Sequence, residues 1–301
     1  MRVVSLLPSA TEIVFALGRG DDLVGVTFEC DYPPDARSRR VVSTSALPEG
    51  LTPAQIDTEV TARIAAGEDL YRLDADALAE LDADVVLTQD LCAVCAVDVD
   101  RVDDALEYLG CSAEVVTLDP RNLREVLRSI LDVGAVLGAS DEARATVALL
   151  DERLAALETA LEGHTPRSVL LLEWTDPPFS AGHWVPDLLD AGGGDPIEAD
   201  PGADSRRIDW ATVGSAKADV VLVAPCGFHL DASFDLARDL VAGRRQPPDA
   251  EVWAVDADSY FVRPGPRVVD GAELVAQILH PDLMGAPDAD RARRVETPSG
   301  G

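Results

Sequence analysis

The chain has 301 residues and a formal net charge of −30, and 47% of its residues are hydrophobic. This length favours two domains, and the apolar content is sufficient for packed cores, which argues against a disordered chain. The acidity makes binding to nucleic acid or to an anionic membrane unfavourable. No apolar run reaches the roughly 20 residues of a transmembrane segment.

Acidic residues are spread along the whole chain, and Lys217 is the single lysine among 25 basic residues. A dispersed acidic surface is typical of proteins from high salt, where screening weakens charge repulsion, so we expect a halophilic source. The first residues, Met1–Ser9, reach a proline at position 8 and lack the pattern of an export signal. The chain is therefore predicted to be cytoplasmic.

The first part of the chain alternates between buried-strand and helix patterns. Ser9 and Glu12 have the spacing of a capping box, which predicts that a helix begins at Ser9. The patterns predict strands over 2–7, 23–28, 84–88 and 114–118, and further helices over 73–81 and 103–109. This alternation predicts parallel α/β layers.

The middle of the chain is helical, over 123–137 and then over 140–161. The second helix contains no glycine or proline, and at 1.5 Å per residue it would be a rod of roughly 33 Å. After it, the α/β alternation restarts at Arg167, and the sequence of Ala83–Leu87 recurs as Ala218–Leu222.

We therefore predict an α/β protein with two similar Rossmann-like lobes, joined by one long helix, with a ligand cleft between the lobes. The N-terminal lobe would cover 1–121, the connecting helices 122–163 with the inter-lobe helix at 140–161, and the C-terminal lobe 164–285. Residues 286–301 are predicted to be a disordered tail. Because the long helix offers no hinge residue, we expect little lobe movement on binding.

Ligands of open α/β sheets bind at the carboxyl ends of the strands, so residues that follow predicted strands are candidates for ligand contact. These candidates are Ser9, Glu29, Asp31, Gln89, Asp90, Glu173, Trp174, His183, Trp184, Phe228, His229, Tyr260, Arg263 and Arg267. Carboxylates, aromatic rings and imidazoles in one cleft suit a large, partly apolar ligand with polar edges. Imidazole is also a common axial ligand of cobalt and haem iron, although a lone histidine is more often structural.

Four of the five cysteines follow predicted strands, namely Cys30, Cys92, Cys95 and Cys226. The odd total argues against a disulfide framework. Three interpretations remain open: a zinc or iron–sulfur site, a thiol-lined ligand cleft, or inert burial. Acidic neighbours disfavour the thiolate needed for catalysis. The sequence also has no nucleophile elbow, P-loop or dinucleotide fingerprint, so we predict that the protein is not an enzyme.

The segment Ser5-Leu-Leu-Pro-Ser-Ala-Thr-Glu12 resembles the opening of the ABC-importer substrate-binding proteins for cobalamin, haem and ferric siderophores. Within that family, the chain is most similar to the cobalamin-binding group over about residues 1–283. The segments that carry the similarity are Glu29-Cys-Asp-Tyr-Pro33, Leu70-Tyr-Arg-Leu-Asp74, Thr88-Gln-Asp-Leu-Cys-Ala-Val-Cys-Ala96, Glu173-Trp174, Gly182-His-Trp-Val-Pro186, Pro225-Cys-Gly-Phe228 and Arg263-Pro-Gly-Pro-Arg267.

This resemblance implies a corrinoid ligand, either cobalamin or cobinamide, with Tyr71 as a further ligand contact. It also implies an importer permease as a partner. One alternative is a haem or ferric chelate on the same scaffold, for which Arg263 and Arg267 would supply positive charge. The other is a cytoplasmic metal or thiol protein that uses Cys30, Cys92, Cys95 and Cys226.

Overall fold

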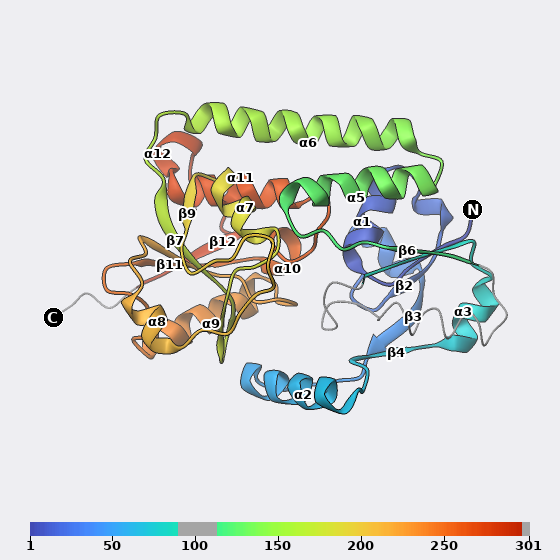
Figure 1. The fold of residues 1–301 in the computed structure, drawn as a ribbon, viewed down its shortest axis with the longest axis horizontal. Coiled ribbons are helices and arrows are strands. Elements are labelled where there is room, and N and C mark those ends of the chain that lie inside the picture. The colour runs from blue at the N-terminus through green and yellow to red at the C-terminus, as the bar shows by residue number, and fades with distance from the viewer. Residues whose placement is uncertain (90–112, 297–301) are drawn as a thin grey trace. The chain divides into compact units, whose positions relative to one another are not determined.

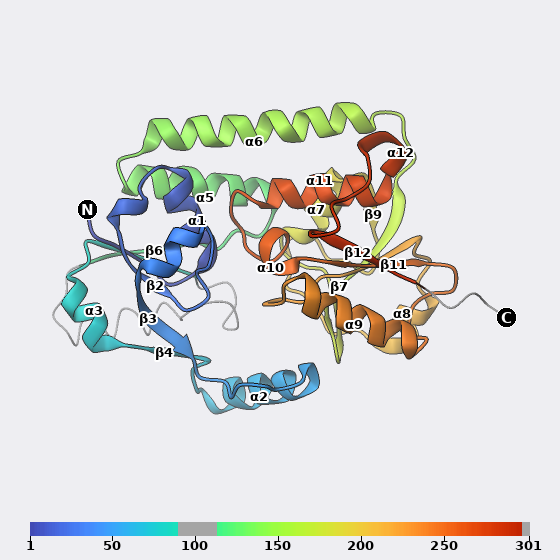
Figure 2. The same cartoon turned by 180° about the vertical axis from the view of Figure 1, so that it is seen from behind.

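The computed structural model describes residues 1–89 and 113–296, which belong to two compact α/β units (Figure 1 and Figure 2). Unit 1 comprises 1–120 and 127–148, and unit 2 comprises 121–126 and 149–301. Helices α5 (Leu123–Val136) and α6 (Ser140–Leu161) have residues in both units. A helix was predicted over 140–161, and α6 has those bounds. Among the described residues, no helix combines the length and apolarity needed to cross a membrane.

Unit 1 is built on a sheet with the strand order β4-β3-β2-β1-β5-β6. Its strands are β1 (Val3–Ser5), β2 (Leu23–Thr27), β3 (Arg40–Ser45), β4 (Tyr71–Leu73), β5 (Val85–Thr88) and β6 (Glu114–Thr117). All neighbouring pairs are parallel except β3 and β4, which are antiparallel. Helix α3 (Ala75–Leu81) packs Leu78 and Leu81 in one cluster with Val4 and Val86, and this buried cluster is the core on that face.

Some predictions for unit 1 are wrong at the level of single elements. Helix α1 (Pro8–Ala16) begins at Pro8 rather than Ser9, and its N-cap, Leu7, makes no side-chain cap. Proline favours the first helical position, so the predicted capping box does not form and Glu12 is buried instead. Strands β3 and β4 and helix α2 (Pro53–Ala66) were not predicted. The helix predicted over 103–109 lies outside the described residues.

Unit 2 is built on a sheet with the order β12-β11-β10-β7-β8, and β9 pairs with β7. Its strands are β7 (Arg167–Thr175), β8 (Pro178–Ser180), β9 (Gly194–Pro196), β10 (Val220–Val223), β11 (Glu251–Val255) and β12 (Ala292–Val295). Figure 1 shows α7 (Val185–Ala191) and α11 (Val268–Leu279) on one face of the sheet, and α8 (Trp210–Ser215) and α9 (Leu230–Ala242) on the other. Two short helices, α10 (Ala257–Tyr260) and α12 (Pro281–Met284), complete the described elements of this unit.

The predicted disordered tail is wrong for residues 292–295, which form β12 and pair antiparallel with β11. Ala292 and Val295 are buried. The two arginines between them form ion pairs, Arg293 with Asp231 and Arg294 with Glu251. This short segment therefore gains both apolar burial and charge pairing from the sheet, which its composition alone did not indicate. Residues 297–301 lie outside the described part of the chain.

The recurring Ala-Asp-Val-Val-Leu sequence has the same structure in both units. In unit 1, Asp84 Oδ2 accepts a hydrogen bond from the Arg2 N–H at 2.7 Å, next to the pairing of β1 with β5. In unit 2, Asp219 Oδ2 accepts one from the Ser168 N–H at 2.8 Å, next to the pairing of β7 with β10. The predicted α/β class with two similar lobes is therefore confirmed.

Candidate functional site

The candidate residues of unit 2 gather at one edge of its sheet. Strands β7, β10 and β11 are adjacent and parallel, so their carboxyl ends lie at the same edge, where ligands of such sheets bind. The residues at these ends are Glu173 and Trp174 in β7, Phe228 and His229 after β10, and Asp256 and Asp258 after β11. The two aspartates were not on the predicted list, although their position after a strand was a usable signal.

Two aromatic side chains pack against each other at this edge. The rings of Trp174 and Phe228 meet edge to face, with centroids 5.5 Å apart and an interplanar angle of 73°. Trp174 Nε1 donates a hydrogen bond to the Asp176 carbonyl at 3.2 Å, which fixes the indole. Both residues are half-buried, so they retain apolar surface that a ligand could cover. Trp184, also a candidate, is instead a core residue whose Nε1 donates to the Phe261 carbonyl at 2.8 Å.

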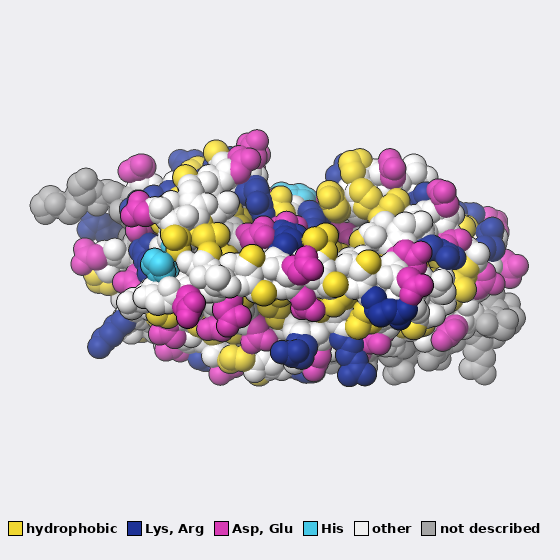
Figure 3. Space-filling view, turned by 90° about the horizontal axis from the view of Figure 1, so that it is seen from above, with side chains coloured by type: hydrophobic (Ala, Val, Ile, Leu, Met, Phe, Trp, Pro, Cys, Tyr) yellow, Lys and Arg dark blue, Asp and Glu magenta, His cyan; other side chains and the backbone are white. Residues whose placement is uncertain are grey.

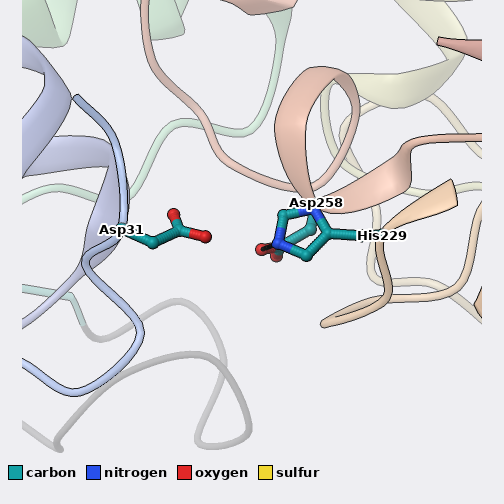
Figure 4. A group of neighbouring side chains, drawn as sticks. All are labelled: Asp31, His229 and Asp258. Carbon is teal, nitrogen blue, oxygen red and sulfur yellow. Dashed lines mark ion pairs between the residues drawn. The ribbon is translucent and has the colours of Figure 1, made fainter. Parts of the chain in front are cut away.

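His229 lies beside the carboxylates of Asp256 and Asp258. Figure 4 draws His229 with Asp258, and with Asp31 of unit 1. The Nδ1 of His229 is 3.0 Å from Asp256 Oδ1, and its Nε2 is 3.6 Å from Asp258 Oδ2. The imidazole is 53% exposed, whereas both aspartates are mostly buried. Asp258 also forms an ion pair with the buried guanidinium of Arg263. The arrangement therefore presents an imidazole whose orientation is set by fixed acidic groups.

Glu173 and His183 hold the loops around this edge. Glu173 Oε1 accepts a hydrogen bond from the Gly182 N–H at 2.9 Å, and Oε2 accepts one from the Ser205 hydroxyl. His183 Nε2 lies 3.2 Å from Asp204 Oδ1, in a backbone conformation with φ of +50°. Burial lowers the pKa of His183, and the charge of Arg121 lowers it further, while Asp204 opposes this shift. Both predicted ligand contacts thus have structural partners within unit 2.

The remaining candidates of unit 2 surround Tyr260. The guanidinium of Arg267 lies 5.8 Å from the centre of the Tyr260 ring, and that of Arg291 lies 4.4 Å from it. These are cation–π contacts, which orient the ring and occupy the faces of the guanidinium groups. Arg267 and Tyr260 therefore stabilise one another at the start of α11.

Two candidate residues of unit 1, Glu29 and Asp31, follow β2. Glu29 Oε2 accepts a hydrogen bond from the Tyr71 hydroxyl at 3.4 Å, and Asp31 lies 3.6 Å from Arg37. Ser9 and Gln89 are buried. Two exposed aromatic residues flank this segment, Phe28 (43% exposed), which was not a candidate, and Tyr32 (46% exposed), which was named only within the segment Glu29–Pro33. Their signal was their position beside Glu29 and Asp31, on the loop that leaves a buried strand.

The cysteines give no complete site within the described residues. Cys30 is buried, and its sulfur lies 3.0 Å from the Thr11 hydroxyl. Cys226 is half-buried after β10. Cys92 and Cys95, together with Asp90, lie outside the described residues, so the four-cysteine zinc or iron–sulfur site stays a prediction.

Most of the chain matches a known protein family. The family model described as periplasmic binding protein matches residues 3–243. The chain belongs to this family. Its members are substrate-binding proteins of ABC importers and are not enzymes, as predicted. By type, the chain is a binding protein of the vitamin B12, haem and siderophore group.

Individual relatives are distant but similar over most of their length. The vitamin B12-binding protein of Vibrio cholerae is 24% identical over 280 residues, which are 92% of this chain and 88% of the relative. An uncharacterized ABC transporter substrate-binding lipoprotein of Bacillus subtilis is 24% identical over 290 residues, which are 94% of this chain and 81% of the relative.

Solved structures show the same fold. A periplasmic haem-binding protein from Pseudomonas aeruginosa has a TM-score of 0.73 and 18% identity, covering 99% of each chain. The periplasmic vitamin B12-binding protein of Vibrio cholerae has a TM-score of 0.63 and 22% identity, covering 92% of this chain and 96% of that chain.

The predicted cytoplasmic location is wrong. The family is periplasmic, and the relatives include periplasmic proteins and a lipoprotein, which point to a location outside the cytoplasm. These relatives give no support for zinc, an iron–sulfur cluster or a halophilic source.

Proposed function

We propose that the chain binds a corrinoid, either cobalamin or cobinamide, and delivers it to an importer permease. The observation that carries this proposal is the combination at the edge of the unit 2 sheet. There the ring of Trp174, in β7, pairs with that of Phe228, in the segment after β10, and Asp256 and Asp258 follow the neighbouring strand β11. The names of the Vibrio cholerae relatives support the same ligand class.

The chemistry of a corrinoid matches these groups. The corrin ring is a broad macrocycle, and an aromatic side chain can cover part of its apolar face. Primary amides surround the ring, and their N–H groups can donate hydrogen bonds to carboxylates. We propose that Asp256 and Asp258 accept such bonds, in addition to the contacts that they make within the protein.

A haem or ferric siderophore is a poorer match for the charges at this edge. Both ligands carry anionic groups, which are repelled by carboxylates and require unneutralised cations. Arg263, one of the two arginines predicted to meet such a ligand, is buried and ion-paired with Asp258. The local charge therefore favours a ligand with neutral amides or a positive charge.

Titration tests the proposal directly. Cyanocobalamin, cobinamide and haemin are added in turn to the purified protein, while heat and the visible spectrum are recorded. We expect a corrinoid Kd of about 1 µM or lower, and weaker binding of haemin by about tenfold or more. Absence of any corrinoid signal at about 50 µM would reject the proposal, and tighter binding of haemin would replace it with the haem alternative.

A matched pair of tryptophan variants tests the position of the ligand. Trp174→Ala removes the ring at the proposed site and should weaken corrinoid binding by about 2 kcal/mol, or about thirtyfold. Trp210→Ala is the control, because Trp210 lies in α8 and stacks on Arg245 at 4.6 Å. The control should leave affinity unchanged. Equal effects of the two substitutions would show that the ligand does not contact Trp174.

A further inference from the structure

Two histidines of unit 2 lie together at the amino end of its sheet, opposite the strand ends that carry the candidate site. His164 lies between the end of α6 and the start of β7, and His280 lies between α11 and α12. Their ring centroids are 6.2 Å apart, with an angle of 68° between the ring planes. Figure 1 and Figure 2 both show α12 beside the end of α6. The fold thus brings together two imidazoles that are distant in the sequence.

The tautomer of His280 is fixed by a backbone carbonyl. Its Nε2 lies 3.2 Å from the carbonyl oxygen of Gly193, which can only accept a hydrogen bond. The ring proton is therefore on Nε2, and a lone pair is on Nδ1. Histidines that bind metals commonly donate their other ring N–H in this way, to a carboxylate or a backbone carbonyl. His280 thus has the tautomer of a coordinating imidazole.

Gly193 allows the ring of His280 to come this close. Its φ is +80°, and a Cβ at this position would lie 2.8 Å from Nε2 of His280 and 3.1 Å from Cδ1 of Leu161. Only glycine fits such a position without a shift of its neighbours. The Gly193 carbonyl also accepts the Arg167 N–H at 3.4 Å, so β7 holds the same turn. The turn, the end of α6 and His280 are therefore packed together.

The charges around the pair favour a cation. His164 follows the C-terminus of α6, where the free helix carbonyls carry partial negative charge. Glu162 and Asp282 are exposed, and each is two residues from one of the histidines. The positive charge of Arg167 is offset by its ion pair with Glu251 at 3.1 Å. A divalent ion bound by the pair therefore gains from the local negative charge.

The geometry of the two rings suits a shared ion. A coordinated metal lies in the plane of each imidazole, about 2.0–2.1 Å from the nitrogen. Planes at 68° to one another meet along a line on which such an ion can lie, whereas parallel stacked rings share no such line. Two imidazoles on one tetrahedral ion have centroids roughly 5 Å apart, so the rings need to approach by about 1 Å. The exposed position of His164 permits that approach.

We propose that His164 and His280 form a binding site for a divalent transition-metal ion of the class of Zn²⁺, Ni²⁺ and Cu²⁺, all of which imidazole suits as a ligand. Among the described residues, no third histidine, cysteine or carboxylate is grouped with the pair, so water completes the coordination. The ion connects the end of α6 to the junction of α11 and α12, and it therefore stabilises unit 2. This site does not depend on the corrinoid function proposed above.

Isothermal titration with NiCl2 tests the site, after metal has been removed with a chelator and accessible thiols have been blocked with iodoacetamide. We expect one Ni²⁺ to bind with a Kd on the order of 10 µM. His164→Gln and His280→Gln should each weaken binding by about tenfold or more, because either change removes the second, intramolecular contact of the chelate. His183→Asn removes a histidine elsewhere in unit 2 and is the control, which should keep the wild-type Kd.

Thermal unfolding gives a second readout, since an ion that binds only the folded protein raises the unfolding midpoint. About 1 mM NiCl2 should raise the wild-type midpoint by roughly 5 °C, and that of either histidine variant by about half as much or less. Equal affinity in the wild-type protein and both single variants would overturn the inference. So would a loss confined to one of the two variants, because the ion would then need a single ring, and so would a failure of the wild-type protein to bind Ni²⁺ at about 1 mM.

Discussion

His183 shows how burial changes the behaviour of a single candidate residue. Burial is the largest cause that lowers its pKa below the ordinary 6.5. In the unfolded chain the ring binds a proton near that pH, whereas in the folded chain it stays neutral to a lower pH. The unfolded state thus binds more protons, so this residue makes the protein less stable as the pH falls below about 6.5.

The substitution His183→Asn tests this effect, and asparagine is chosen because it tolerates the φ of +50° at this position. Urea unfolding is measured at about pH 7.5 and about pH 5.5. We expect the wild-type protein to lose more stability than the variant between these two values. Parallel losses in the two proteins would show that His183 titrates equally in both states.

At the scale of elements, both units hold the first strand of the sheet against a neighbouring strand through the same two hydrogen bonds, made by one aspartate. Asp84 and Asp219 each precede a central strand. Asp84 accepts a hydrogen bond from the N–H of Arg2, just before β1, and Asp219 accepts one from the N–H of Ser168, the second residue of β7. The same two residues also donate their own N–H groups back, to the carbonyls of Arg2 and Ser168. Two hydrogen bonds in opposite directions thus fix the register at that end of each pair.

Removing either carboxylate should therefore destabilise the protein. We expect Asp84→Ala and Asp219→Ala each to lower the free energy of unfolding by about 1 kcal/mol, because both sites are exposed and the backbone donor can rebind water. The asparagine variants keep an acceptor and should lose less. Asp239→Ala, at an exposed position of α9, is the control. Urea unfolding midpoints report the differences, and a loss no larger than that of the control would contradict the assignment.

The elements that the sequence predicted best have a strong pattern of their own. Helix α6 was predicted with its observed bounds, because 22 residues without glycine or proline leave no competing structure. Strands β3 and β4 were missed because Arg40–Ser45 and Tyr71–Leu73 are short and polar, and their pairing with each other and with β2 defines them. Helix α2 has no buried residue, so it lacks the apolar periodicity on which such predictions depend.

The candidate site was predictable only in outline. Strand ends located Glu173 and the loops that carry His183 and His229, because that rule depends on the fold class alone. The strand-end rule did not show that both carboxylate oxygens of Glu173 accept hydrogen bonds within unit 2, from the Gly182 N–H and the Ser205 hydroxyl. Nor did it select Asp256 as the partner of His229. These assignments depend on side chains that are distant in sequence, and local patterns carry no information about them.

At the scale of the whole molecule, the location shows the limit of local sequence evidence. Residues Met1–Ser9 contribute β1 and the first residues of α1, so the fold accounts for their sequence pattern. The compartment is indicated instead by similarity that extends over residues 3–243.

The net charge of −30 leads to a prediction for the whole molecule. Figure 3 shows carboxylates scattered over the visible surface and interspersed with arginines, rather than collected in one patch. Local ion pairs such as Arg206 with Asp200 offset part of this charge, but 55 acidic against 25 basic side chains leave a formal excess of 30 negative charges. Repulsion among the remaining charges destabilises the compact state, and salt weakens it by screening.

We therefore expect the midpoint of thermal unfolding to rise by roughly 5 °C or more between about 0.1 M and about 1 M KCl, as the Debye length falls from about 10 Å to about 3 Å. Most of the rise should occur in the lower half of this range, because general salting-out continues at higher concentrations whereas screening saturates. The variant Asp151→Lys/Glu158→Lys reverses two exposed charges on α6. It should be more stable than the wild-type protein at low salt, and the difference should vanish at about 1 M. A midpoint that does not change with salt, or a variant with no advantage at low salt, would show that the acidic surface is already balanced by its local ion pairs.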